Sequence, residues 1–240
     1  QNQISAASLT VARGGVLALS RGFGRMRPEA GAPKTAADAV FLLASITKPV
    51  TACALVRLAE EGKVSLNDPV DAYLPEFTGG SRAKVKVKHL LSHVSGMPDM
   101  LPHNVALRQR HAPLADFVDG ALHTPLIFEP ATSFSYQSKG TLLAAEIVER
   151  VSGRPLREYE REIFFEPLGM RRSALGLGDF SIEDTVWCGT ETNEDEETRS
   201  WGWNTPYWRD LGAPWGGMHS CGPDLAVFLQ AMLQGGAYGA

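Results

Sequence analysis

The chain is short of the features that mark several large classes of protein. Its three cysteines, Cys53, Cys188 and Cys221, are too few and too scattered among 240 residues for a disulfide framework. No apolar run approaches the roughly 18 residues that a membrane-spanning helix needs, so we expect no membrane span. Positive charge is also limited, because 23 Lys and Arg stand against 27 Asp and Glu. The net charge of −4 argues against a nucleic-acid-binding protein.

Several short motifs of cofactor and metal chemistry are missing as well. There is no Gly-rich phosphate loop and no G-x-S-x-G element. His89 and His93 have a spacing that suits a metal, but Leu90 stands where the H-E-x-x-H motif requires glutamate. Cys188, His219 and Cys221 could in principle gather around a metal, but they lack the paired spacing of a zinc site. We therefore expect no metal and no organic cofactor.

The composition that remains is that of a globular protein, with 44% hydrophobic and 21% charged residues. The length suits one large domain or two small ones. The sparse cysteines favour a reducing compartment such as the cytoplasm. The first residues carry no secretion signal, and a periplasmic or secreted location after removal of such a signal stays open.

Local patterns predict both strands and helices. Apolar runs on either side of Gly14 and Gly15 predict a hairpin in residues 7–22. A helix is expected from residue 45 to residue 61, with Gly62 as its stop and Ile46, Val50, Ala54 and Leu58 on its buried face. Residues 85–88 alternate and predict a short strand, whereas the acidic segment 183–199 predicts a solvated loop. Further helices are expected at 89–93, 114–123, 140–151, 155–165 and 223–234.

Ser45 and Lys48 form an S-x-x-K pair at the start of the first expected helix. Residues three apart share a helix face, so the hydroxyl and the amine can meet, and a neutral lysine can take the proton of an attacking serine. Ser81 and Lys84 match the same pattern. Because Ser81 follows two glycines and precedes the expected strand, we interpret the second pair as a solvated turn. From this pattern alone, Ser45 is either a nucleophile or a helix cap.

Longer motifs around these residues resemble the serine β-lactamase-like family, which includes class C β-lactamases, penicillin-binding DD-peptidases, D-amino-acid amidases and carboxylesterases of the same fold. The matching segments occur in the family's order and cover nearly the whole chain. They are 45–52 (SITKPVTA), 58–70 (LAEEGKVSLNDPV), 90–96 (LLSHVSG), 134–140 (FSYQSKG), 165–170 (FEPLGM) and 215–228 (WGGMHSCGPDLAVF).

The resemblance implies three catalytic residues. Ser45 corresponds to the nucleophile that forms the acyl-enzyme, Lys48 to its proton partner, and Tyr136 to the tyrosine of the Y-x-N element that passes a proton to the leaving group. Ser138 stands where that element has asparagine, and it is with Trp215 a candidate substrate-binding residue. His93 lies in a matching segment, and we expect it to have a structural hydrogen-bonding role.

The resemblance also implies an α/β sandwich, in which helices flank an antiparallel sheet and a second part is mostly helical. We expect one domain over residues 1–240, with an α/β part at about 1–75 and 213–240 and a mostly helical part at about 76–212. The family's third motif, on a strand beyond the segment 215–228, is not found. We therefore expect the C-terminal strands to be missing from this chain, with the sheet completed either by later residues or by a second polypeptide fragment.

The function implied is that of a serine hydrolase acting on a small-molecule ester or amide. Ser138 in place of asparagine favours a carboxylesterase. β-Lactam, D-peptide or D-amino-acid amide hydrolysis is the alternative with the same mechanism, and a non-catalytic scaffold of the same fold is the alternative from another class. The five tryptophans between Trp187 and Trp215 predict either a local core or an aromatic wall beside a ligand.

Overall fold

The computed structural model describes residues 4–189 and 198–237, which form two compact units. Unit 1 comprises Gln1–Leu43, Arg161–Gly212 and Gly217–Ala240, and unit 2 comprises Ala44–Glu160 and Ala213–Gly216. Antiparallel sheets with helices in unit 1 and a helical unit 2 confirm the expected fold class. Residues 190–197 of the expected acidic loop lie outside the described part. No helix within the described residues has both the length and the apolar character needed to cross a bilayer.

The first two strands of unit 1 form the predicted hairpin. β1 (Ala6–Arg13) pairs antiparallel with β2 (Val16–Gly24), and Arg13 faces Val16 across the turn. Gly14 and Gly15 have φ angles of +57° and +77°. Glycine adopts such angles without steric cost, and a two-residue turn of this kind matches the twist of the strands that it joins.

A second, three-stranded sheet in unit 1 has the order β3-β5-β4 with both pairings antiparallel. Its strands are β3 (Phe41–Leu42), β4 (Ala174–Leu175) and β5 (Met218–Ser220). The sequence did not predict β5, because the only element expected in this part of the chain was the helix at 223–234. That helix is α8 (Gly222–Leu233), which contacts β1. A β-carbon at Gly222 would lie 3.1 Å from Ser8 Oγ and closer still to Thr10, so glycine permits this approach.

A buried arginine holds the last part of unit 1 together. Arg209 lies in α7 (Pro206–Asp210), a helix that the sequence did not predict, and is 1% exposed. It donates hydrogen bonds to the carbonyl oxygens of Trp203 and Val186 and to the side-chain oxygens of Thr185 and Asn204, at 2.6–3.0 Å. These acceptors replace the water that a buried cation loses, and they join segment 185–186 to segment 203–204.

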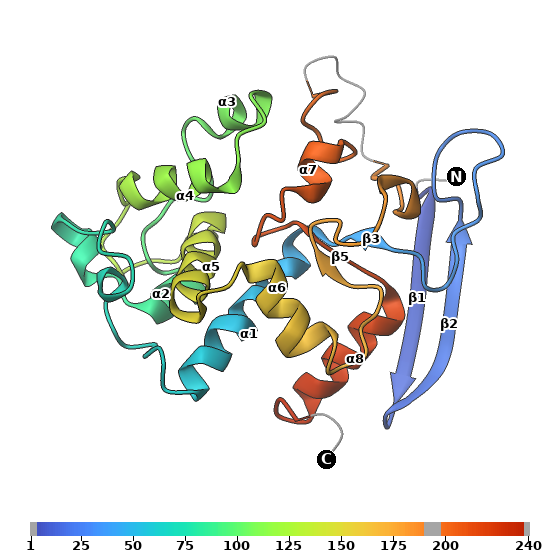
Figure 1. Cartoon of the computed structure of the whole chain (residues 1–240), viewed down its shortest axis with the longest axis horizontal. Coiled ribbons are helices and arrows are strands. Elements are labelled where there is room, and N and C mark those ends of the chain that lie inside the picture. Colours follow the sequence, from blue (N-terminus) through green and yellow to red (C-terminus); the bar gives the residue numbers. More distant parts are fainter. Residues whose placement is uncertain (1–3, 190–197, 238–240) are drawn as a thin grey trace. The chain divides into compact units, whose positions relative to one another are not determined.

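Unit 2 is built around one central helix. α5 (Ser138–Ser152) contacts α1 (Thr47–Glu60), α2 (Val87–Leu91), α4 (Leu114–His123) and α6 (Leu156–Glu160), as Figure 1 shows. α3 (Asn104–Gln109), which the sequence did not predict, contacts α4. Short 3₁₀ turns lie at Ala44–Ile46, Val70–Ala72 and Gly80–Lys84, and a π-helical turn at Arg161–Phe165 belongs to unit 1. Because α1 packs against α5 and α6, it groups with the helical unit and not with residues 1–43, which differs from the expected boundary near residue 75.

The helix α1 follows its predicted pattern except at its start. Val50, Ala54 and Leu58 are buried, and Gly62, with φ at +71°, follows the helix end. Ile46 was expected on the buried face but is 54% exposed. The reason is that Ile46 belongs to the preceding 3₁₀ turn and is the N-cap of α1, so it lies outside the repeat of the helix.

The predicted strand at residues 85–88 is wrong. Val85 and Val87 are both fully buried, and Val87 already begins α2. The backbone N–H of Lys86 donates to Nδ1 of His89 at 3.1 Å, which caps the helix start. The alternating valines therefore mark the buried start of a helix and not a strand with one solvent-exposed face.

Candidate active site

Ser45 lies at the tight turn from which α1 starts. The preceding residue, Ala44, has a φ of +48°, which is rare and strained for a residue with a β-carbon. The hydroxyl of Thr47 donates to the carbonyl oxygen of Ala44 at 2.7 Å and holds this turn closed. The turn leaves Ser45 exposed while Thr47 and Lys48, on the next turn of chain, are buried.

The structure brings together the three residues predicted to be catalytic. Lys48 Nζ donates to Ser45 Oγ at 3.0 Å, and the phenol of Tyr136 donates to the same oxygen at 2.8 Å. Lys48 is 8% exposed, whereas Tyr136 is 43% exposed. Both distances allow direct proton transfer to or from the serine oxygen.

The amine of Lys48 is held from two further sides. It donates to the carbonyl oxygen of Trp215 at 2.8 Å, and it lies 4.8 Å from the centre of the Tyr136 ring. The carbonyl belongs to the short segment Ala213–Gly216, which is far along the chain but part of unit 2. These two contacts direct the lysine side chain, which is flexible by itself, toward Ser45.

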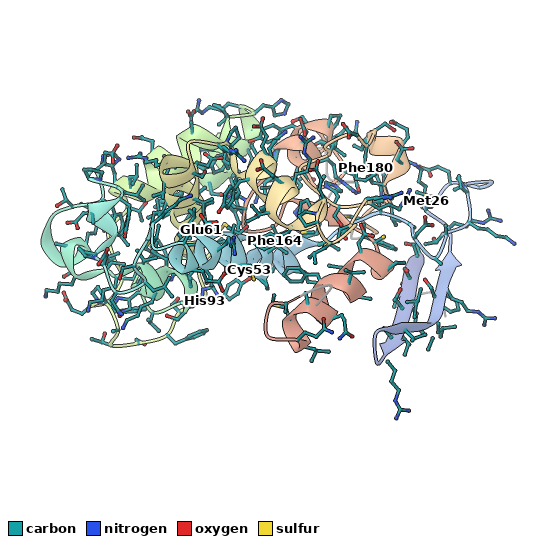
Figure 2. The ribbon with its side chains drawn as sticks, turned by 60° about the horizontal axis from the view of Figure 1, so that its bottom comes forward. Met26, Cys53, Glu61, His93, Phe164 and Phe180 are labelled. Carbon is teal, nitrogen blue, oxygen red and sulfur yellow. The ribbon has the colours of Figure 1, made fainter. Side chains whose placement is uncertain are left out.

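His93 supports Tyr136. Its ring lies 4.8 Å from the Tyr136 ring, and its Nδ1 accepts a hydrogen bond from the backbone N–H of Gln137 at 3.3 Å, in agreement with the predicted structural role. Burial, with the charge of Lys48 second, lowers the pKa of His93, so the imidazole is neutral at pH 7. Figure 2 labels His93 and, on α1, Cys53.

A cavity of about 530 Å³ opens beside Ser45 within unit 2. Apart from the catalytic residues, its walls are mostly apolar. The lining residues are Ser45, Ile46, Lys48, Pro49, Ala52, Leu91, His93, Tyr136 and Thr141.

The two predicted substrate-binding residues occupy other positions. Ser138 is 2% exposed, and both its backbone N–H and its hydroxyl donate to Oδ1 of Asp99 at 2.8 Å. The ring of Trp215 is also buried, packed against Phe117 and Lys139. Neither side chain lines the cavity. Ser138 and Asp99 join at the start of α5, and the main-chain oxygen of Trp215 accepts from Lys48. A substrate-binding role for Ser138 and Trp215 stays a prediction. Trp215 is also the one tryptophan of the expected cluster that belongs to unit 2.

Below Lys48 on the same face of α1, Thr51 joins a second buried cluster. Its hydroxyl lies 3.0 Å from the carbonyl oxygen of Pro214 and 3.2 Å from Oε1 of Glu160. Glu160 is fully buried, and its Oε2 has no hydrogen-bond partner among the described residues. Burial raises the pKa of Glu160 to about 8. No sequence pattern marks this carboxyl, because only the fold shows that α6 turns it inward.

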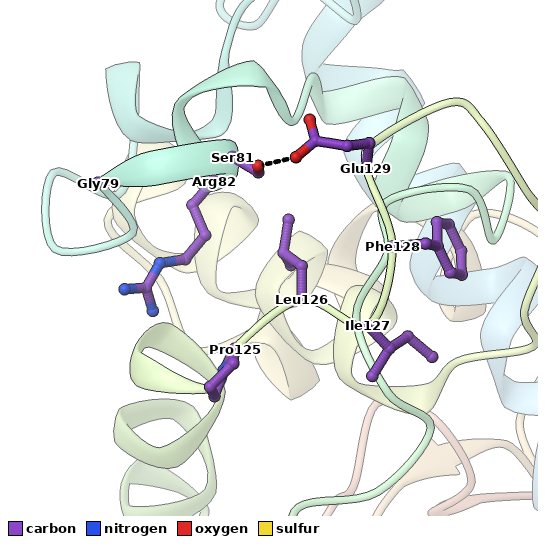
Figure 3. Close-up of a pocket in the computed structure, with 8 residues that line it drawn as sticks. All are labelled: Gly79, Ser81, Arg82, Pro125, Leu126, Ile127, Phe128 and Glu129. Atoms are coloured by element: carbon purple, nitrogen blue, oxygen red, sulfur yellow. Dashed lines mark hydrogen bonds between the residues drawn. The ribbon is translucent and has the colours of Figure 1, made fainter.

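The second S-x-x-K match is built differently. Ser81 Oγ donates to Glu129, and Lys84 Nζ binds the other oxygen of that carboxylate at 3.0 Å, so both residues engage Glu129 instead of each other. They lie in the 3₁₀ turn Gly80–Lys84, and Ser81 lines a surface pocket of about 460 Å³ that Figure 3 shows. Gly79, Ser81, Arg82 and residues 125–129 line this pocket. The predicted surface turn is confirmed.

Metal-binding side chains do not gather in the part of the chain that the structure describes. Within residues 4–189 and 198–237, no group of three or more His, Cys, Asp or Glu forms a metal site. Cys53, Cys188 and Cys221 are all free thiols.

Comparison with known proteins identifies the family. Residues 1–239 match the family described as Beta-lactamase. The chain belongs to the beta-lactamase family. Esterase EstB of Burkholderia gladioli is 33% identical over 186 residues, which cover 71% of the chain and 47% of that protein. Penicillin-binding protein 4* of Bacillus subtilis is 32% identical over 148 residues, covering 58% of the chain and 31% of the relative.

The family's fold is confirmed at the level of structure. The D-amino acid amidase of Ochrobactrum anthropi SV3 complexed with L-phenylalanine superposes with a TM-score of 0.81 at 25% identity, covering 98% of the chain and 68% of the amidase. This is the expected β-lactamase/transpeptidase-like fold. The chain spans half or less of the length of the two curated relatives above.

Proposed function

We propose that the protein is a serine hydrolase that cleaves small-molecule esters through an acyl-enzyme on Ser45. The observation that supports this proposal is the position of one serine oxygen within 3.0 Å of both a lysine amine and a tyrosine phenol. A serine hydroxyl needs a neighbouring base before it attacks a carbonyl, and both groups are placed to take its proton.

In the proposed first step, Ser45 Oγ attacks the carbonyl carbon of the ester while its proton moves to the Lys48 amine, directly or through Tyr136. The tetrahedral intermediate expels the alcohol, which leaves with a proton from Tyr136, and the proton taken from Ser45 then restores the phenol. In the second step water adds to the acyl-serine ester and gives up a proton to the same pair. The acid leaves as the bond to Ser45 Oγ breaks, and the pair returns the proton to that oxygen. The enzyme is restored, and the sum is ester plus water to acid plus alcohol.

Two observations favour esters over amides. Ser138 stands where the family's Y-x-N element has an amide side chain, and its hydroxyl is bound to Asp99, so no side-chain amide is offered to the substrate there. The second observation is the 33% identity to an esterase. Hydrolysis of β-lactams, D-peptides or D-amino-acid amides is the second candidate, supported by the similarity to a penicillin-binding protein and to a D-amino acid amidase.

The free thiols favour a reducing compartment such as the cytoplasm.

A serine-reactive phosphonate tests the catalytic residues. Peptide mapping of the labelled protein should place the label on Ser45, and Lys48→Ala should abolish labelling. Lys84→Ala, in the second S-x-x-K match, is the matched control and should leave labelling unchanged. Absence of label anywhere in a folded protein would contradict the proposal and favour a non-catalytic scaffold.

Substrate class is tested separately, by comparing turnover of a short-chain aryl ester with that of a chromogenic cephalosporin. We expect turnover of the ester to dominate and Ser45→Ala to abolish it. Fast cephalosporin hydrolysis with negligible ester turnover would instead establish the second candidate.

A further inference from the structure

Lys139 is a buried lysine beside the proposed active site that the proposed reaction does not use. It is the second residue of α5 and is 0% exposed. Within the part of the chain that the structure describes, its Nζ has no hydrogen-bond partner. An amine in this position costs stability compared with an apolar side chain of similar length, so the fold alone gives no reason for a lysine here.

Two aromatic rings lie against this amine. Nζ lies 4.0 Å from the centre of the Trp215 ring and 5.4 Å from that of Phe117. The two rings also contact each other, with their centres 5.9 Å apart. A cation over an indole face is attracted to the ring, and the attraction is stronger when both are shielded from water.

The ring that Lys139 contacts belongs to the residue that holds Lys48. The carbonyl oxygen of Trp215 accepts from Lys48 Nζ at 2.8 Å, and Lys48 Nζ reaches Ser45 Oγ at 3.0 Å. A shift of the indole would move this carbonyl, because both belong to one residue of the short segment Ala213–Gly216. The contact of Lys139 with the ring therefore bears on the position of the Lys48 amine.

We propose that Lys139 is a positioning residue for acyl transfer at Ser45: its amine holds the Trp215 ring, and through it the carbonyl that directs Lys48 to the serine. The inference rests on the proposed function. When Lys139 is charged it attracts the ring most strongly, and the ring belongs to the residue whose carbonyl oxygen accepts from Lys48 Nζ. A firmly held carbonyl keeps the Lys48 amine within reach of Ser45 Oγ and so favours proton transfer from the serine.

The charge on Lys139 changes within the range of ordinary assays. The pKa of Lys139 is lowered to about 7, and burial is the largest cause. The charges of Arg108 on α3 and Lys48 on α1 lower it further, whereas the charge of Asp99, between α2 and α3, raises it. Raising the pH through 7 thus removes the charge. We expect wild-type kcat to fall over this interval by about fivefold, with KM unchanged because Lys139 does not line the cavity.

Lys139→Met provides the test, because methionine keeps the length of the chain and removes the charge at every pH. Hydrolysis of an aryl ester by the full chain is measured at about pH 6 and about pH 8.5. The variant should be about fivefold slower in kcat than wild type at the lower pH and equal to it at the higher pH. Lys84→Met, which replaces an exposed lysine in another part of unit 2, should match wild type at both.

A merely structural role for Lys139 would lower activity by the same factor at both pH values, and that result would overturn the proposal. If Lys139→Met does not fold, Trp215→Leu carries the test, since it removes the ring and should abolish the same pH-dependent step. A Trp215→Leu enzyme that keeps the step would also overturn it. Failure of the proposed function is distinct, because wild type would then show neither phosphonate labelling at Ser45 nor ester turnover.

Discussion

Replacing Glu160 by glutamine should stabilise the protein, and by more as the pH rises. The carboxyl is fully buried, and desolvation raises its pKa from an ordinary 4.5 to about 8. Between these values the unfolded chain has released a proton that the folded chain retains, so the stability of wild type falls with rising pH. At about 1.4 kcal/mol for each pH unit, the loss reaches at most about 5 kcal/mol.

The hydroxyl of Thr51 can pair with either form of the acid: donated to Oε1 it lowers the pKa of Glu160, against the larger effect of burial. Thr51 has one hydroxyl proton, yet both the carbonyl oxygen of Pro214 and Oε1 of Glu160 lie within its reach, at 3.0 and 3.2 Å. A protonated carboxyl can donate to Thr51 Oγ and leave the threonine proton for Pro214. The side-chain amide introduced by Glu160→Gln reproduces this arrangement, because it also has a donor and carries no charge.

Urea unfolding followed by circular dichroism, at intervals from about pH 4 to about pH 8.5, measures the effect. The unfolding free energy of wild type should fall relative to that of Glu160→Gln as the pH rises, and the difference should be near zero below about pH 4.5 and constant above about pH 8. Glu158→Gln, which replaces an exposed carboxyl in the same helix, is the matched control and should run parallel to wild type. Parallel curves for wild type and Glu160→Gln would refute the reasoning, because Glu160 would then ionise alike in both states.

Three further predictions concern unit 1. Burial lowers the pKa of His219 to about 4, so the neutral imidazole favours the folded state fully above about pH 6.5, and this part of the unfolding free energy is lost as the pH falls toward 4. His219→Gln should remove up to about 3 kcal/mol of this loss, measured by urea unfolding at each pH. Arg209→Met should lower the unfolding free energy by more than about 3 kcal/mol in the same assay, because it leaves several buried acceptors unpaired. Gly222→Ala should cost about 1–3 kcal/mol in thermal unfolding, since its methyl group would press on Thr10 of β1.

Features set by neighbouring residues were the ones that the sequence predicted well. The hairpin at Gly14 and Gly15 follows from two residues that accept positive φ angles, and α4 follows from a helical repeat that fills one buried face. The prediction at residues 85–88 was wrong because the pattern there is not set by neighbouring residues. Their burial comes from contacts across the fold, and a short apolar pattern cannot tell a strand from a buried helix start.

The same distinction between neighbouring and distant residues applies to the candidate active site. Ser45, Lys48 and Tyr136 could be predicted because the segments around them resemble motifs of the family. The structure places the three side chains together. The supporting contacts were missed because they join distant segments by shape alone. Asp99 caps α5 from 39 residues away, and the carbonyl of Trp215 meets Lys48 from 167 residues away. Main-chain oxygens have no sequence signature, so no motif could have revealed the second of these contacts.

The segment Ala213–Gly216 explains how such distant parts act as one site. Lys48 and Thr51 are three residues apart and share a face of α1, and they donate to the carbonyl oxygens of two consecutive residues, Trp215 and Pro214. Because both bonds come from one rigid helix, the segment cannot slide along α1 without breaking both. The amine that Ser45 needs is thus held by a segment that two bonds tie to α1 and that the buried Trp215 ring, in contact with Lys139, ties to α5. A change at Lys139 is therefore expected to reach Lys48 through Trp215, without contact with the substrate.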